Sequence, residues 1–292
     1  MQSRIHALYC CILCLPLLCQ AAEPASPAQQ TAPLKPAKAQ LAIIIDDVGL
    51  NLENGVRALA IPGPMTFAIL PHRKYSSQLA YLAGRLNKDV MLHAPMSTVR
   101  NTELGDGALD ESLDESAFKQ RLMFSLNNTP NIKGMNNHMG SRLTANSLYM
   151  QWVMEVLKEK HLFFVDSRTS ADSVAYDIAQ QDNIPSLRRD IFLDHEVNTE
   201  FVNQQFKKAV QIARKYGSAV AIGHPHRVTL DYLNRAVLEL PELGIQQVTV
   251  STMLASQIQK RPISAPMEPA GMEPSLDGLV KQLITQNNTR SN

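Results

Sequence analysis

Ionisable side chains follow apolar, β-branched runs at seven places in this chain. Each run is of the kind that forms a buried strand, and each ends in Asp, His or both. In a sheet or barrel of parallel strands the carboxyl ends meet at one rim, where ligands bind. The endings therefore predict a single site, rich in the side chains that bind a divalent metal. They are Asp46-Asp47, His72, His93, His138, Asp166, Asp194-His195, and His224 with His226.

Asp46 and Asp47 are adjacent carboxylates that follow Leu41–Ile45, a continuous apolar run typical of a strand buried on both faces. Two such charges repel each other unless a proton or a cation lies between them. One interpretation is a turn in which an Asp caps the next helix. The other divides the work: one carboxylate binds a metal and its neighbour accepts a proton from water.

Asp47, His93 and His138 together form the donor set typical of catalytic zinc, with one coordination position left for water. Such a metal lowers the pKa of water from about 15.7 to about 7. The three residues lie far apart in the sequence, so only the fold can bring them together. The second nitrogen of each imidazole needs a partner to orient the ring, and the candidates are Asn136, Asn137 and Asp166.

His224 and His226 flank a proline directly after the apolar run Ala219–Ile222. Two histidines on so rigid a backbone at a strand end indicate site chemistry, with His226 as an orienting or substrate-contacting residue. Asp194, in the sequence Asp194-His195-Glu196, is expected in a charged turn from which it could orient another group. Two interpretations of His72 remain: it lines the rim, or it lies in a solvated loop.

The elements that must position these residues alternate between strand-like and helix-like patterns from residue 41 to about residue 257. Strands separated by helices of 10–15 residues indicate βαβ units and a parallel sheet. The pattern predicts a (β/α) barrel, closed or incomplete, or a doubly wound sheet, with residues 94–113 as a loop beside the site. The expected helices are Ser76–Leu86, Asp114–Asn127, Ser147–Lys160, Phe201–Tyr216 and Thr229–Leu240.

Composition excludes several classes of partner. The chain has 292 residues, 45% of them hydrophobic, which suffices for one well-buried domain of barrel size. Its net charge is +1, and removal of the first 21 residues leaves 27 basic and 27 acidic groups. This balance gives no electrostatic argument for binding nucleic acid or an anionic membrane.

The N-terminus has the pattern of a secretory signal peptide at residues 1–21. Arg4 precedes the apolar run Ala7–Cys19, which is too short to span a bilayer comfortably, and small residues follow it. All four cysteines lie in this segment, so a metal site must be built from His and carboxylates. Residues 22–40 are expected to be a disordered Ala/Pro/Gln-rich spacer, 41–257 the folded domain, and 258–292 a Pro-rich disordered tail.

Four motifs resemble the divergent polysaccharide deacetylase family of bacterial exported proteins, distant relatives of chitooligosaccharide-type deacetylases. They are Ile43–Gly49, Met91–Met96, Asn136–Ser141 and Ile222–His226, in this order along the chain. The resemblance implies an α/β fold, a distorted (β/α)7-type barrel of parallel strands, and metal-dependent removal of acetyl groups from an acetylated glycan. With the signal peptide, it places the protein in the periplasm of a Gram-negative bacterium; secretion, or tethering by an uncleaved signal, is the alternative.

The resemblance also implies residue roles: Asp46 as general base, Asp47 and His93 as metal ligands, and His224 as the group that protonates the leaving amine. The metal is expected to be Zn²⁺. The family's second ligand His would stand at position 97, where this chain has Ser97. We assign its place to His138 from the residue types alone.

Two other functions stay open. A deacetylase-like scaffold without activity, which binds a glycan or an envelope partner, is favoured by Ser97. A metallophosphoesterase is suggested by Asn137-His138 and Gly223–His226, but the Asp-x-His that such enzymes carry after the first strand is here Asp46-Asp47-Val48.

Overall fold

The structure is a computed structural model that describes residues 38–260, with side chains up to residue 257. The expected signal peptide lies outside the described residues, as do the expected spacer up to residue 37 and the tail from 261. The first strand begins at Ala39 and the last helix runs to Lys260. The domain boundaries expected at 41 and 257 therefore fall inside regular elements, and the folded part is longer at both ends.

The described residues form one nine-stranded sheet in which every strand pair is parallel. The strand order is β6-β5-β4-β3-β2-β1-β8-β7, and β9 pairs with the beginning of β1. The strands are β1 Ala39–Val48, β2 Thr66–Ile69, β3 Asp89–Met96, β4 Ile132–Met139, β5 Phe163–Asp166, β6 Ser186–Arg188, β7 Ile191–Phe192, β8 Ser218–Gly223 and β9 Ile245–Val248.

The sheet curls almost into a closed barrel. β6 and β7 are at opposite ends of the strand order, yet only Arg189 and Asp190 separate them in the chain. Two residues span about 7 Å beyond the strand ends, so the two edges must approach each other. The expected distorted (β/α)7-type barrel of parallel strands is confirmed. A flat, doubly wound sheet is not what the chain forms.

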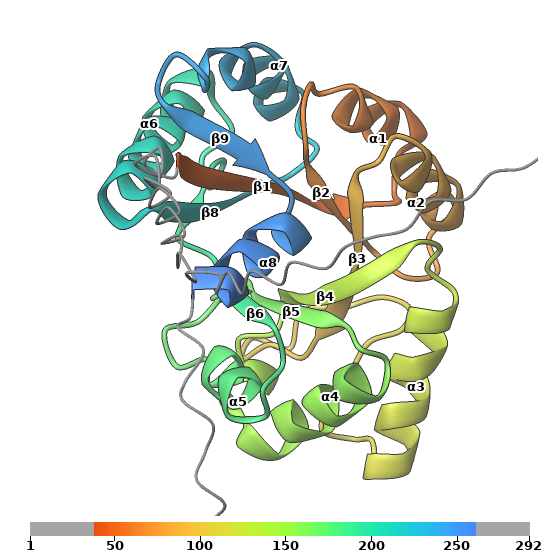
Figure 1. Cartoon of the computed structure of the whole chain (residues 1–292). Coiled ribbons are helices and arrows are strands. Elements are labelled where there is room, and N and C mark those ends of the chain that lie inside the picture. The colour runs from red at the N-terminus through yellow and green to blue at the C-terminus, as the bar shows by residue number, and fades with distance from the viewer. Residues whose placement is uncertain (1–37, 261–292) are drawn as a thin grey trace, which may run out of the picture. The chain divides into compact units, whose positions relative to one another are not determined.

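Helices surround this curled sheet (Figure 1). The helices expected from apolar spacing are present as α2, α3, α4, α6 and α7. Three others were not expected: α1 with 8 residues, α5 with 7, and α8 with 11 at the C-terminal end of the described residues. The bounds are α1 Leu52–Leu59, α2 Ser76–Arg85, α3 Glu115–Asn127, α4 Ser147–Glu159, α5 Ala175–Gln181, α6 Thr199–Tyr216, α7 Arg227–Ala236 and α8 Val250–Lys260.

Side chains of β1 alternate between two hydrophobic clusters. Leu41, Ile43 and Ile45 pack outward against α1, α2, α6 and α7. Ala42 and Ile44 point into the barrel, where they pack with residues of α8. Because side chains alternate along a strand, the next position of the inward series after Ile44 is Asp46.

The same alternation carries other strand-end residues into the barrel. Met91 in β3 and Ile222 in β8 belong to the inner cluster. His93 and His224 lie two positions later and continue the inward series. Met135 in β4 belongs to an outer cluster, so Asn136 faces inward. The inner face of the barrel is therefore apolar toward the amino ends of the strands and polar at their carboxyl ends.

α8 covers the apolar end of the barrel interior, and in Figure 1 it lies at the centre of the curled sheet. Its start is tied to two strands. The Val250 amide donates to Thr66 Oγ1 at 3.0 Å, and the Ser251 amide donates to Asp89 Oδ2 at 2.9 Å. These bonds fix the start of α8 at the amino ends of β2 and β3. The histidines lie at the opposite, carboxyl ends of the strands.

The loop expected at 94–113 begins later than expected. β3 continues through Met96 because it pairs with β4 along Met91–Met96. Leu109 then returns to the sheet edge, where its amide donates to the carbonyl of Pro95 at 2.8 Å. The intervening segment is a loop, as expected, and it lies beside β3 and β4.

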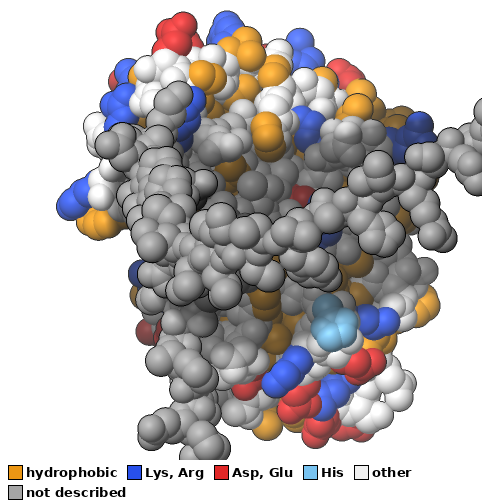
Figure 2. Space-filling view, in the orientation of Figure 1, with side chains coloured by type: hydrophobic (Ala, Val, Ile, Leu, Met, Phe, Trp, Pro, Cys, Tyr) orange, Lys and Arg blue, Asp and Glu red, His pale blue; other side chains and the backbone are white. Residues whose placement is uncertain are grey.

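The described helices include none with the length and apolar character needed to cross a membrane. On the face drawn in Figure 2, the coloured basic and acidic side chains lie intermixed along the upper and lower rims.

Candidate metal and proton-transfer site

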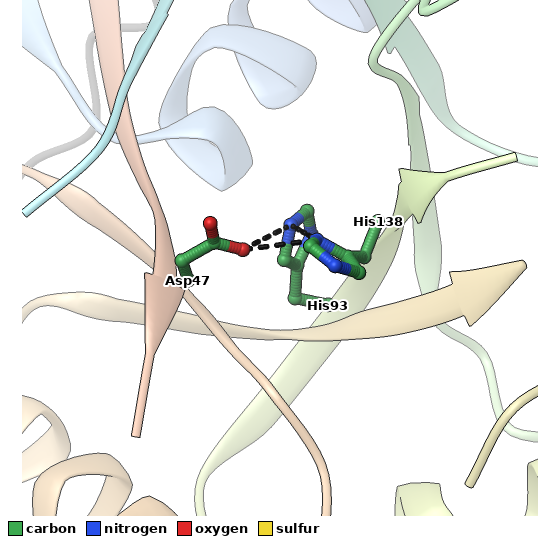
Figure 3. A group of neighbouring side chains, drawn as sticks. All are labelled: Asp47, His93 and His138. Carbon is green, nitrogen blue, oxygen red and sulfur yellow. Dashed lines mark hydrogen bonds and ion pairs between the residues drawn. The ribbon is translucent and has the colours of Figure 1, made fainter. Parts of the chain in front are cut away.

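Asp47, His93 and His138 come from β1, β3 and β4 and meet at the carboxyl rim (Figure 3). Asp47 Oδ1 lies 3.2 Å from His93 Nε2 and 2.9 Å from His138 Nδ1. The two imidazole nitrogens are 3.0 Å apart. The three atoms thus form a nearly equilateral triangle, and this is the arrangement for which the sequence analysis predicted a metal.

The triangle fits a divalent metal. Zinc lies about 2.0–2.1 Å from nitrogen and carboxylate ligands in tetrahedral sites, which separates the ligand atoms by about 3.3 Å. The edges found here are close to that value. Asp47 Oδ1 is also buried and makes no hydrogen bond, so it is available as a ligand. The donor set of two imidazoles and one carboxylate is that of catalytic zinc sites with an open position.

The backbone of β1 explains how two adjacent carboxylates reach one site. In a regular strand Asp46 and Asp47 would point to opposite faces. The pairing of β1 with β2 shifts register between Ile45 and Val48, and Asp47 has a φ of 56°, in the left-handed region. This bulge turns the Asp47 carboxylate back to the side of Asp46. Strain of this kind is concentrated at functional sites.

Asn136 links the ligand cluster to Asp46. Its Oδ1 lies 2.7 Å from His93 Nδ1, which fixes the ring so that Nε2 faces Asp47. Its amide nitrogen donates to Asp46 Oδ1 at 2.8 Å and lies 3.2 Å from Ser167 Oγ. Asn136 is therefore the partner predicted to orient an imidazole.

Asp46 and Asp47 have opposite pKa shifts. Burial raises the pKa of Asp46 above its usual value, and it outweighs the opposing effects of His93, His224 and Asn136. For Asp47 burial also acts to raise the pKa, but the contacts with His138 and His93 outweigh it and hold the pKa well below the usual range. The surroundings of Asp47 thus favour its charged form, whereas those of Asp46 favour the protonated form more than water does.

His93 is buried between these two charges. Burial acts to lower its pKa, but the charge of Asp46 and the contact with Asp47 outweigh burial and raise it. A proton and a metal ion therefore compete for the same imidazole.

His224 forms a separate pair with Asp194. Its Nδ1 lies 2.8 Å from Asp194 Oδ1, and its amide donates to Asp194 Oδ2 at 2.7 Å. Thr229 Oγ1 donates to the same Oδ2 at 2.8 Å. Burial acts to lower the pKa of His224, but the bond to Asp194 and the charges of Asp46 and Asp194 outweigh it and raise the pKa to about 9. The imidazole therefore carries a proton at neutral pH.

Asp194 was expected in a charged turn from which it could orient another group, and the sequence did not indicate that this group is His224. β7 pairs with β8 in the register Phe192↔Ile222, and two residues further along the same register Asp194 meets His224. The signal is therefore strand pairing, which requires the tertiary fold.

Asp194, His224 and His226 also offer ligand atoms within 4.8 Å of one another. Both Asp194 oxygens already accept hydrogen bonds, as described above, and His226 is exposed. The group is therefore better suited to hold a proton on His224 than to hold a metal. His226 contacts the ring of His224, with centroids 5.9 Å apart.

Asn137 and Asp166, two predicted orienting residues, do not contact the imidazoles. Both lie in the outward series of their strands. Asn137 donates to the carbonyl of Met139 and accepts from the amide of Ser167, while Asp166 accepts from the Arg168 amide and from Ser173 Oγ. They stabilise the loops beside the site.

Two other positions are settled by their contacts. His72 Nε2 lies 3.1 Å from Ser125 Oγ and its ring stacks on Phe124, away from the ligand cluster. Ser97 Oγ donates to Glu111 Oε1 at 2.7 Å, so it contacts the adjoining loop, and His138 supplies the third corner of the triangle.

Comparison with known proteins gives a consistent result. A sequence model of divergent polysaccharide deacetylases matches residues 43–254. An uncharacterized protein of Haemophilus influenzae is 40% identical over 206 residues, which are 70% of this chain and 74% of that protein. The uncharacterized protein YibQ of Escherichia coli K12 is 34% identical over 215 residues, 74% of this chain and 67% of that protein.

A crystal structure of an uncharacterized protein from Agrobacterium tumefaciens superposes with a TM-score of 0.69 at 22% sequence identity. The match covers 75% of this chain and 90% of that one. At this level of identity the likeness concerns the fold, and it agrees with the curled parallel sheet described above.

Proposed function

The chain belongs to the divergent polysaccharide deacetylase family, and from this premise we propose that it is an exported, metal-dependent deacetylase of carbohydrates. Its substrate in this proposal is an N-acetylated glycan of the cell envelope or the extracellular space, and the bond cleaved is the amide. One observation carries the proposal: a three-atom ligand cluster lies beside two separate groups that can hold a proton, Asp46 and His224.

Asp47, His93 and His138 would hold the metal, for which zinc fits the donor set. When bound, the metal supplies a Lewis acid that polarises the acetyl carbonyl and makes water more acidic. The remaining steps belong to side chains of this chain.

Asp46 is placed to act as the general base. Its Oδ1 is held by Asn136, and its Oδ2 lies 3.6 Å from His93 Nε2, so the carboxylate borders the ligand cluster. Burial raises its pKa toward the range in which a base is effective at neutral pH. Asp46 would take a proton from the attacking water while the water oxygen bonds to the acetyl carbon.

His224 is placed to act as the general acid. Asp194 holds Nδ1 and keeps the ring charged, which leaves Nε2 free to donate. A cavity of about 180 Å³ is lined by both Asp47 and His224, so the two face one space. His224 would give its proton to the amide nitrogen as the carbon–nitrogen bond breaks, and the products are acetate and an amino sugar.

Export is part of the proposal and is supported by the sequence of residues 1–21, which has the charge, apolar run and small residues of a signal peptide. The periplasm of a Gram-negative bacterium is the proposed location. The family membership supports a deacetylase over the alternative of a metallophosphoesterase.

The proposal is tested by measuring metal content and acetate release from N-acetylated cell-wall and exopolysaccharide fragments. We expect one metal ion per chain and acetate release, with both lost in Asp47→Ala. Asp177→Ala is the matched control, because Asp177 is an exposed carboxylate on α5. Metal and glycan binding without acetate would instead support the inactive scaffold and contradict the deacetylase.

A further inference from the structure

Arg73 Nε is the one buried side-chain nitrogen of the described residues that has no hydrogen-bond partner. The rest of the Arg73 side chain is partly exposed. A buried N–H without an acceptor is costly, and native proteins keep few of them unless the group has a ligand to bind. No described residue accepts a hydrogen bond from Arg73 Nε, so this N–H is available to a ligand.

The surrounding loops hold Arg73 in place. Its amide donates to Ser76 Oγ at 3.2 Å, and Ser76 Oγ donates to the carbonyl of Leu70 at 2.5 Å, which fixes the turn between β2 and α2. Gly105 packs on the guanidinium: it has a φ of 80°, and a Cβ there would lie 1.8 Å from Arg73 Nη2. Only glycine allows the loop to come so close.

Arg73 lines the same cavity as two members of the ligand cluster. This cavity, of about 210 Å³, is bordered by Asp47 and His138 as well as by Arg73. A glycan with its acetyl group at the cluster would therefore reach the guanidinium with a neighbouring substituent. The other walls are Leu50, Leu70, Glu103, Leu104 and Gly105.

We propose that Arg73 binds a carboxylate on the glycan, so that the substrate class is an acidic, N-acetylated glycan. This inference rests on the proposed function, because it places the acetyl group of the same glycan at Asp47, His93 and His138. The planar guanidinium fork matches a carboxylate through two parallel hydrogen bonds, which gives both charge and geometry. The carboxylate is either a lactyl ether on the acetylated sugar or the acid group of an adjacent uronic acid.

Glu103 lines the same cavity and forms no ion pair with Arg73. Its negative charge opposes that of the proposed ligand. Replacing it by Gln removes this repulsion and keeps the size of the side chain, so Glu103→Gln is expected to act in the opposite direction from the loss of Arg73.

The test is equilibrium binding by calorimetry with the full chain at fixed ionic strength. One probe is an N-acetylglucosamine oligosaccharide with a 3-O-lactyl carboxylate, and the other carries a uronic acid next to the acetylated sugar. Each is compared with its carboxamide. We expect about tenfold tighter binding of the carboxylate in one of the two arms, and that arm identifies the source.

Arg73→Gln is expected to reduce this ratio to about one, and Arg73→Lys to keep part of it, because Lys retains the charge without the fork. Glu103→Gln is expected to increase it. The ratio is measured within each variant, so a change in stability affects both forms alike. Equal binding of carboxylate and carboxamide by the wild-type chain in both arms, or an unchanged ratio in Arg73→Gln, would overturn the proposal.

Acetate release from the same probes separates the two proposals. A carboxylate preference without acetate leaves the role of Arg73 standing and contradicts the deacetylase. Acetate release at equal kcat/KM from carboxylate and carboxamide contradicts the role of Arg73 and leaves the deacetylase standing.

Discussion

Asp46 and Asp47 show how neighbouring residues of one type acquire different chemistry. Asp47 faces two imidazoles, which stabilise its negative charge, whereas Asp46 is enclosed in the barrel, where burial disfavours that charge. One is suited to hold a cation and the other to accept a proton. Environment sets this division, because the two side chains are chemically identical.

Replacing Asp46 by Asn is predicted to reduce kcat by about 10²–10⁴-fold, the usual contribution of a general base. Metal content should stay near that of the wild-type chain, because Asp46 is not part of the three-atom cluster. Acetate release and elemental analysis on the same sample check both statements. Loss of metal together with activity would show that Asp46 is a ligand.

Replacing Asp194 by Asn is predicted to change stability in a defined pH range. The folded-state pKa of His224 is raised from 6.5 to about 9, so its contribution is complete below about 6.5 and is lost as pH rises through about 9. The pKa of Asp194 is lowered from 3.8, so its contribution holds above that value and is lost as pH falls. We expect a loss of about 2 kcal/mol near pH 6 and almost none near pH 10.

Urea unfolding at the two pH values measures this difference. The proposed deacetylase activity offers a second readout, since a general acid must carry its proton: the alkaline fall in kcat should move to lower pH in Asp194→Asn. A loss of stability of equal size at pH 6 and pH 10 would contradict the ion pair.

At the scale of elements, strands β1, β3, β4 and β8 each direct every second side chain into the barrel interior. Along each strand these inward side chains are first apolar and then, at the carboxyl end, polar.

The close packing of β4 against β5 depends on Gly134, where a Cβ would lie 2.2 Å from the ring of Phe163. Since β4 carries Asn136 and His138, a shift of this strand would move the site as well.

Gly134→Ala is therefore predicted to destabilise the protein by about 2 kcal/mol through overpacking. Gly217→Ala is the control: its φ of 86° strains an alanine, but no atom lies within 4 Å of a Cβ there, so a cost of about 1 kcal/mol is expected. Thermal unfolding of both variants checks the order. A larger loss in Gly217→Ala would contradict the packing argument.

At the scale of the whole molecule, the proposed metal would couple ligand binding to the stability of the fold. The ligands come from β1, β3 and β4, and the nearest two in sequence, His93 and His138, are 45 residues apart. A metal that binds only the folded chain stabilises it by mass action. Protons compete for His93, whose pKa is raised, so the stabilisation must weaken as pH falls.

We predict that a fixed excess of Zn²⁺ raises Tm more at pH 8 than at pH 5.5, and that Asp47→Ala abolishes the increase at both values. Differential scanning calorimetry with and without a chelator measures it. An increase that is independent of pH would indicate ligands other than the imidazoles.

Much of this arrangement could be predicted from the sequence, because strand and helix periodicity and the polar strand ends are local properties. They indicated the parallel α/β fold, the five helices α2, α3, α4, α6 and α7, and a rim that carries Asp47, His93 and His138. The short helices α1 and α5 were missed, since 7 or 8 residues give too little periodicity to recognise.

The rest depended on tertiary structure. A polar residue at a strand end faces either the barrel interior or the helices, depending on its position in the alternation of side chains along the strand. Asn136 faces inward and contacts His93, whereas Asn137 and Asp166 face outward. The pairing of β7 with β8 brought Asp194 to His224, and a bulge in β1 brought Asp47 to the side of Asp46. Sequence by itself determined which groups could do chemistry; which of them meet was decided by strand register and backbone distortion, because both arise only when distant segments pack together.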